Sequence, residues 1–221
     1  MNREIITTGD GSASVRIHGT NVTYHSIHGA MAESQHVFIE AGLRPGLPGT
    51  LRILEIGLGT GLNLLLTRMA AMETGSAIHY LALEPYPLTG SEWGKLDYCS
   101  LLNRGELQPF FEQIHRCGWE SEQALEPDFF LYKTKCSLLD FSTDRHFDLI
   151  YFDAFAPNAQ PELWTTPVFE KLYKQLLAGG SLVTYCSKGD VRRAMQAAGF
   201  VVEKIPGPPR KREMVKARKP V

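Results

Sequence analysis

The 221-residue sequence predicts an α/β fold, with a mostly parallel, doubly wound sheet. Three observations lead to this fold class. Short apolar runs alternate with segments of helical periodicity, a glycine-rich turn joins one run to a helix, and acidic residues stand where two runs end. Strands separated by helices favour right-handed crossovers, and the ligands of such sheets bind at the carboxyl ends of the strands.

The expected elements fall into an N-terminal extension, 1–48, and a core, 49–221. The extension carries short β-like pieces, "ASVRIHG" and "NVTYHS", and then a helix over 29–42. Within the core, residues from about 85 to 129 are longer than an ordinary crossover and indicate a helical insertion beside the sheet. The core strands are expected at 50–57, 77–85, 128–141, 147–155, 179–187, 201–205 and 212–219, with helices at 61–73 and 189–200.

The composition, with 43% apolar and 21% charged residues, is that of an ordinary globular protein. No apolar stretch approaches the roughly 20 residues of a membrane span, and no signal-peptide pattern is present. The four cysteines stand 18 or more residues apart, which is typical of free thiols in a reducing compartment. We therefore expect a cytoplasmic protein with no membrane partner.

The net charge of −1 hides a basic end. From Lys188 onward the chain has ten Lys and Arg and three Asp and Glu, a surplus of +7, so the preceding part carries −8. A basic end on an acidic body favours an anionic partner, and a solvated tail is the alternative.

The segment "LEIGLGTGLN" (54–63) places Gly57, Gly59 and Gly61 between a strand and a helix. Glycines let the backbone turn and approach a ligand closely, and the free N–H groups of the helix suit a carboxylate. Glu55 is placed to attract the ammonium of an amino-acid-like ligand. Leu62 stands where a dinucleotide fingerprint has glycine, which disfavours a dehydrogenase; a plain strand–turn–helix junction is the other alternative.

A second acid, Glu84, ends the next strand, 23 residues after Gly61. An acid in this place accepts hydrogen bonds from the hydroxyls of a ribose. A ribose together with an amino-acid end favours S-adenosyl-L-methionine over NAD. Thr60 and Asn63, in the same glycine-rich segment, are further candidate cofactor residues.

The stretch "YFDAFAPNAQPELW" (151–164) puts Asp153 at the carboxyl end of the fourth core strand, which we expect beside the first. An amine that attacks a methyl sulfonium loses a proton and gains positive charge, and a nearby carboxylate stabilises that charge. Phe155, Pro157 and Trp164 are candidates for the walls of a slot that holds a planar base. A loop hydrogen bond for Asp153, and core packing for Trp164, are the alternatives.

Several segments resemble the methyltransferase domain of the bacterial tRNA 5-aminomethyl-uridine modification enzymes (MnmC-like). The resemblance implies a Rossmann-like class I S-adenosylmethionine-dependent methyltransferase that methylates the exocyclic amine of 5-aminomethyl(-2-thio)uridine at the tRNA wobble position. It also implies that Asp153 orients the acceptor, and that Gly57, Gly59, Gly61 and Glu84 hold the cofactor. The segments are "LEIGLGTGLN", "LALEPYPLT", "YFDAFAPNAQPELWT", "GGSLVTYCSKGDVRRAMQAAGF" and "PGPPRKREM", extended by "TYHSIHGAMAESQHVF" (23–38).

The chain departs from this family in two respects. Bifunctional members add a flavin-dependent oxidase, whereas this chain ends at Val221, so we expect a separate flavin-dependent enzyme to supply the aminomethyl substrate. An acid often follows the third strand in this family and faces the adenine; here "KCSLLD" offers Ser137 instead, and we expect Ser137 or Asp140 to compensate. The resemblance further suggests that Tyr24 and Glu33 close over the cofactor.

The basic end then supplies candidates for binding an anticodon loop, whose bases are already exposed. They are Lys188, Arg192, Arg210, Lys211 and Arg212. His25, His28 and His36 lack a ligand motif, so no metal is expected. Two other functions stay open: a small-amine transferase such as an aminopropyltransferase, and a non-catalytic RNA-binding module.

Overall fold

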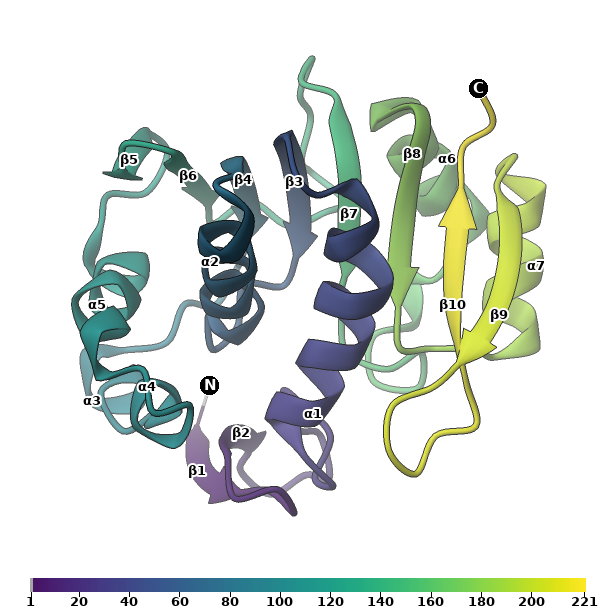
Figure 1. Ribbon diagram of the computed structural model, residues 1–221. Helices are drawn as coiled ribbons and strands as arrows, with labels where there is room; N and C mark the ends of the chain where they lie inside the picture. Colours follow the sequence, from purple (N-terminus) through teal and green to yellow (C-terminus); the bar gives the residue numbers. More distant parts are fainter. Residues whose placement is uncertain (1) are drawn as a thin grey trace.

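An eight-stranded sheet runs through the centre of the computed structural model, which describes residues 2–221 (Figure 1). The strand order is β5-β6-β4-β3-β7-β8-β10-β9. The five strands from β6 to β8 are parallel, and the pairs at the two margins are antiparallel. The predicted α/β class with a mostly parallel sheet is therefore confirmed. The strands are β3 Thr50–Ile56, β4 Ala77–Leu83, β5 Glu122–Glu126, β6 Phe129–Thr134, β7 Phe147–Phe152, β8 Leu176–Thr184, β9 Val201–Pro206 and β10 Glu213–Arg218.

One margin of the sheet differs from the prediction. The third core strand ends at Thr134, not at residue 141, and an additional strand, β5, lies within the region that was expected to be helical. Pro127 and Asp128 make the two-residue turn that joins β5 to β6 as an antiparallel pair. The β5 sequence, EQALE, is rich in residues that are depleted in strands, so it forms through its pairing with β6.

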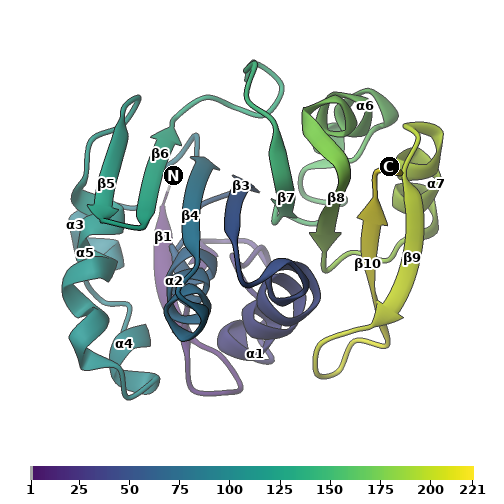
Figure 2. The ribbon, with the colours of Figure 1, turned by 45° about the horizontal axis from the view of Figure 1, so that its top comes forward.

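Helices cover the two faces of the sheet (Figure 2). One face packs against α2 (Leu62–Thr74), the π-helix η1 (Gln35–Leu43) and α5 (Gln108–Arg116). The other packs against α6 (Thr166–Gln175) and α7 (Gly189–Ala197). No helix was predicted over 166–175; α6 has proline in its first turn, which suits a helix start, and buries Val168, Phe169 and Leu172. The insertion holds three further short helices: α3 Gly90–Trp93, α4 Tyr98–Leu101 and the 3₁₀ turn η3 Gly105–Leu107.

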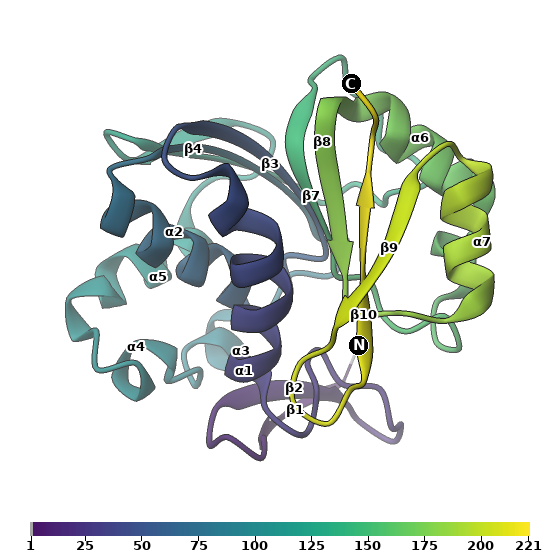
Figure 3. The ribbon, with the colours of Figure 1, turned by 45° about the vertical axis from the view of Figure 1, so that its right-hand side comes forward.

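The N-terminal segment crosses the molecule at the carboxyl ends of the parallel strands (Figure 3). A hairpin, β1 (Arg3–Thr7) and β2 (Ala13–Ile17), leads into α1 (Ala30–Ser34), which continues directly into η1, and a 3₁₀ turn, η2 (Arg44–Gly46), follows. The predicted helix is thus present. The segment "NVTYHS" makes only one isolated bridge, and β1 was not predicted. Arg3 anchors the hairpin by donating to the carbonyl oxygens of Tyr86 (2.5 Å) and Pro87 (3.1 Å).

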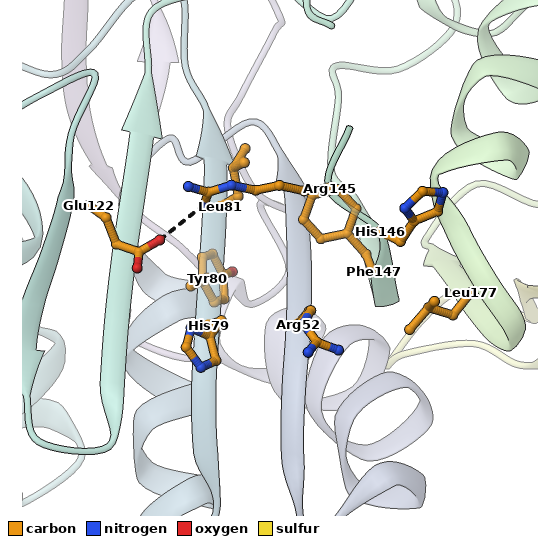
Figure 4. Close-up of a pocket in the computed structure, with 9 residues that line it drawn as sticks. All are labelled: Arg52, His79, Tyr80, Leu81, Glu122, Arg145, His146, Phe147 and Leu177. Carbon is orange, nitrogen blue, oxygen red and sulfur yellow. Dashed lines mark hydrogen bonds and ion pairs between the residues drawn. The ribbon is translucent and has the colours of Figure 1, made fainter. Parts of the chain in front are cut away.

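The connection between β6 and β7 contains no helix, so part of the sheet is left uncovered. A hollow of about 420 Å³ lies there against Arg52 of β3 and His79 of β4, near the amino ends of these strands (Figure 4). Arg145 and Glu122 form an ion pair of 3.1 Å across it. This hollow is at the opposite end of the strands from the glycine loop. Within residues 2–221, none of the helices combines the length and the apolar character that a membrane crossing requires.

Candidate active site

The glycine loop turns back tightly after β3. The N–H groups of Gly57 and Leu58 both donate to the carbonyl oxygen of Leu83, at the end of β4, over 3.0 and 3.1 Å. Gly57 has a φ of 91°, and a Cβ there would lie 2.9 Å from the carbonyl oxygen of Asp153. Only glycine fits this position, because a side chain would collide with backbone and the φ is unfavourable for other residues. The loop is thus held between the ends of β4 and β7.

A cavity of about 370 Å³ opens above this loop. Its volume is in the range of small-molecule sites, and its walls are mainly apolar with three acids, Glu84, Asp153 and Glu162. The N-terminal segment, the glycine loop and the segments after β4, β6 and β7 all contribute. The lining residues from these segments include Ile17, Val22, Tyr24, His25, Gly57, Gly59, Glu84, Tyr86, Ser137, Leu138, Leu139, Asp153 and Phe155.

Glu84 is fixed at the cavity wall by two backbone donors. Its Oε2 accepts from the N–H of Gly59 (2.8 Å), and its Oε1 accepts from the N–H of Tyr86 (2.9 Å). Burial raises the pKa of this carboxyl, and the two backbone hydrogen bonds oppose that shift. Each oxygen keeps a further lone pair, so the group can still accept hydrogen bonds from a diol such as a ribose.

Asp153 is linked to Glu55 through a single amide. The Nδ2 of Asn63 donates to the Oδ2 of Asp153 and to the Oε1 of Glu55, both over 2.9 Å. Burial raises the pKa of Asp153 to about 8; the charge of Glu33 adds to this shift, whereas the bond from Asn63 and the charge of Lys211 oppose it. A carboxyl with this pKa can take up and release a proton near neutral pH.

Three comparisons bear on what this cavity holds. A family model described as S-adenosyl-L-methionine-dependent methyltransferase matches residues 130–220. Over 212 residues the chain is 32% identical to the tRNA 5-methylaminomethyl-2-thiouridine biosynthesis bifunctional protein MnmC of Cupriavidus metallidurans, with 88% of this chain covered. It is also 32% identical, over 209 residues and 87% of its length, to the protein of the same name from Ectopseudomonas mendocina. The chain spans 31% of the length of each of these relatives.

The chain contains an MnmC-like methyltransferase domain. The crystal structure of MnmC2 from Aquifex aeolicus has the same fold, with a TM-score of 0.78 and 22% identity over all of this chain and 72% of that one. The cofactor of the domain is S-adenosyl-L-methionine. The residues present fit this group, because the glycine turn leaves room for a ligand backbone and Glu84 faces the cavity with free lone pairs.

Tyr24 and His25 of the MnmC-like domain close one side of the cavity. The ring of Tyr24 meets that of Phe155 edge-to-face, with 5.2 Å between centroids. The Nε2 of His25 lies 2.7 Å from the Oγ1 of Thr60, and burial lowers the pKa of this histidine to about 4. His25 is therefore neutral at physiological pH and connects the N-terminal segment to the glycine loop.

Several candidate residues do not line the cavity. Glu55 is fully buried beneath the loop, where burial raises its pKa, and Gly61 caps α2. Asn63 is hydrogen-bonded to Asp153, and Thr60 is hydrogen-bonded to His25, so both support cavity residues from outside the cavity. Pro157 is half-buried outside the cavity.

Trp164 supports the cavity wall from behind. Its indole Nε1 donates to the carbonyl oxygen of Phe155 (2.8 Å), and its ring packs on Phe152. This placement corresponds to the packing alternative. Glu33, expected over the cofactor, also lies outside the cavity and forms an ion pair of 2.5 Å with Lys211.

The segment after β6 contributes more than the sequence indicated. Ser137 lines the cavity, but its hydroxyl donates to the Oδ2 of Asp140 (2.6 Å). Leu138 and Leu139 line the cavity beside it, which the sequence reasoning missed; the apolar pair within "KCSLLD" was the available signal. This wall therefore offers a flat aromatic ligand mainly apolar contact.

The basic residues lie at two places. At the start of α7, Lys188 donates to the Oδ1 of Asn158 (2.7 Å) and Arg192 donates to the carbonyl oxygen of Ser187 (3.3 Å). In the loop between β9 and β10, Arg210 and Arg212 are exposed. Two histidines meet the same hairpin: His28 lies 3.5 Å from Arg210, and His36 contacts the carbonyl oxygen of Pro206 at 2.8 Å.

Proposed function

We propose that this chain transfers a methyl group from S-adenosyl-L-methionine to the exocyclic amine of 5-aminomethyl(-2-thio)uridine at the wobble position of tRNA. The observation that carries the proposal is Asp153, a carboxyl that reaches the wall of the cavity above the glycine loop. The relatives are named for the biosynthesis of tRNA 5-methylaminomethyl-2-thiouridine, which supports this choice of acceptor.

Bound S-adenosyl-L-methionine supplies an electrophilic methyl group on a positively charged sulfur. In our proposal Glu84 binds the ribose, and the glycine loop leaves space for the amino-acid end. Asp153 holds the amine and takes its proton, so that the nitrogen lone pair is free to attack. Asn63 keeps the Oδ2 of Asp153 in place, and the positive charge of an arriving amine favours the ionised carboxylate.

Phe155 and Tyr24 make an aromatic corner beside Asp153 that is suited to stacking on a pyrimidine. In the proposal, Lys188, Arg192, Arg210 and Arg212 bind the phosphates of the anticodon loop, and Pro157 and Trp164 support the acceptor side of the slot. We further propose that a separate flavin-dependent activity prepares the aminomethyl group. The free cysteines suit a reducing compartment such as the cytoplasm, where we place the protein.

The test is mass spectrometry of nucleosides after the chain and isotope-labelled S-adenosyl-L-methionine have been incubated with tRNA that carries 5-aminomethyluridine. Labelled 5-methylaminomethyluridine is the expected product. Turnover of putrescine with decarboxylated cofactor, and none of tRNA, would instead identify an aminopropyltransferase. Binding of tRNA without binding of S-adenosyl-L-methionine in calorimetry would identify a non-catalytic RNA-binding module.

A further inference from the structure

An ion pair between a buried carboxylate and a partly exposed ammonium lies near Asp153. Glu33, on α1, has a side chain that is only 8% exposed, and its Oε1 lies 2.5 Å from the Nζ of Lys211. Its Oε2 accepts from the N–H of Ser26 over 2.8 Å. Lys211 comes from the loop between β9 and β10, so the pair joins the two ends of the chain. A buried carboxylate is costly without a cation, and here one ammonium supplies it.

The charges of both members of the pair affect the pKa of Asp153. The negative charge of Glu33 raises the pKa of Asp153, and the positive charge of Lys211 lowers it. The Nζ of Lys211 also lies 4.4 Å from the ring centroid of Tyr185, whose hydroxyl donates to the carbonyl oxygen of Ala154, the residue after Asp153. We call Glu33, Asp153, Tyr185 and Lys211 the acceptor cluster.

The acceptor cluster reaches the cofactor cavity through one residue. Of its four members, only Asp153 lines that cavity. Asp153 can therefore serve both a methyl donor in the cavity and an acceptor that binds at Glu33 outside it. The space around the Nζ of Lys211 already satisfies a primary ammonium, with one carboxylate and one aromatic face.

The acceptor amine has the same chemistry as the group that Glu33 already binds. A primary alkyl amine, like that of lysine, is largely protonated near neutral pH, so the aminomethyl group arrives as an ammonium. Lys211 is 35% exposed and sits between the exposed Arg210 and Arg212, so it can leave without opening the core. Glu33 cannot leave, because it is buried and bonded to backbone.

We propose that Glu33 receives the ammonium of the acceptor nucleoside in exchange for Lys211, which turns outward onto an RNA phosphate. The proposal rests on the proposed function and deepens it, because it assigns acceptor specificity to a residue that was expected near the cofactor. Glu33 pairs with Lys211 in the free protein and with the substrate ammonium in the complex, so its buried carboxylate always has a cationic partner. Recognition of the amine is then coupled to binding of the RNA backbone, because a tRNA that lacks the aminomethyl group leaves Lys211 paired with Glu33.

The test compares the affinities for two tRNAs that differ only at the wobble position, one with 5-aminomethyluridine and one with uridine. Binding is measured with S-adenosylhomocysteine present, so that no turnover occurs. The ratio of the two dissociation constants cancels contributions from the rest of the RNA. Wild type is expected to prefer the aminomethyl tRNA, and Glu33→Gln to lower that preference about tenfold, as for the loss of a charged partner.

Lys211→Met is expected to change the ratio in the opposite direction. It removes the competitor for Glu33, so the preference for aminomethyl tRNA should rise about fivefold. The released pair with a buried carboxylate outweighs the exposed phosphate contact of Lys211, which only the aminomethyl complex makes. Lys204→Met is the matched control, because it deletes an exposed Lys–Glu pair, with Glu213, on the same hairpin; its ratio should equal that of wild type.

A wild-type ratio in Glu33→Gln, with an unchanged melting temperature, would overturn the inference. If that variant fails to fold, Lys211→Met decides alone, and a ratio equal to or below that of wild type overturns the inference. Failure of the proposed function looks different: wild type would then methylate neither tRNA in the nucleoside assay. Methylation by wild type together with an unaltered ratio in both variants rejects only the exchange at Glu33.

Discussion

Replacing Asp153 by alanine tests the proposed chemistry directly. The change removes the only side chain of the acceptor cluster that also lines the cofactor cavity, and leaves the Gly57 turn and Glu84 intact. Loss of one preorganised charged contact typically costs about 3–4 kcal/mol in the transition state, which corresponds to a fall of about 10²- to 10³-fold in kcat. The affinity for S-adenosyl-L-methionine should change by less than about threefold.

The assay is transfer of labelled methyl groups to aminomethyl tRNA, with calorimetry of cofactor binding on the same preparations. Because the pKa of Asp153 is raised to about 8, its ionised fraction grows as pH rises toward 8, and kcat/KM of wild type should rise with it. This rise should be absent from Asp153→Ala. Turnover within tenfold of wild type, or a pH profile that keeps its rise, would refute the role of Asp153 as proton acceptor.

The same carboxyl should also affect stability with a defined sign. Its folded pKa lies above the unfolded value of about 4, so the stabilisation that it contributes is complete below pH 4 and is lost as pH rises to about 8. The melting temperature of Asp153→Asn, relative to that of wild type, should therefore increase between pH 4 and pH 8. A difference that is constant over this range would contradict the assignment.

Three further predictions concern the cofactor and the RNA. Gly57→Ala should destabilise the fold by about 1–3 kcal/mol and abolish cofactor binding, because of its φ and the 2.9 Å contact; Gly105→Ala, with open space around it, is the control in thermal denaturation. Glu84→Gln should weaken S-adenosyl-L-methionine about tenfold or more by calorimetry, and unchanged affinity would remove it from the ribose site. Replacing Arg210 and Arg212 by glutamine should flatten the log–log salt dependence of tRNA affinity by about 1.5, and an unchanged slope would mean that this loop faces away from the RNA.

The sequence was sufficient for the parts of the fold that depend on local pattern. Gly57 and Glu84 stand at fixed places after β3 and β4, and an apolar run followed by an acid located Asp153 at the end of β7. The carboxyl ends of parallel strands lie at the same edge of the sheet, so neighbouring strands bring these residues together. The order of β3 and β7, side by side, was predicted and is confirmed.

The features that were missed depend on contacts between distant segments. The strand β5 has weak strand propensity and forms through β6, whereas Trp164 could be assigned to the core only once Phe152 was seen beneath it. The pairing of Glu33 with Lys211 spans almost the whole chain. No periodicity or spacing encodes such a pair, because it arises from the way in which the β9–β10 loop returns to α1.

The position of β10 between β8 and β9 also sets an order of assembly during translation. β9 pairs only with β10, so it stays without a neighbour until residues 213–218 have left the ribosome. Glu33, by contrast, precedes every strand of this sheet in the chain, whereas its partner Lys211 lies in the loop of the β9–β10 hairpin. A nascent chain can thus build the part of the sheet around the glycine turn before the β9–β10 hairpin and Lys211 have been synthesised.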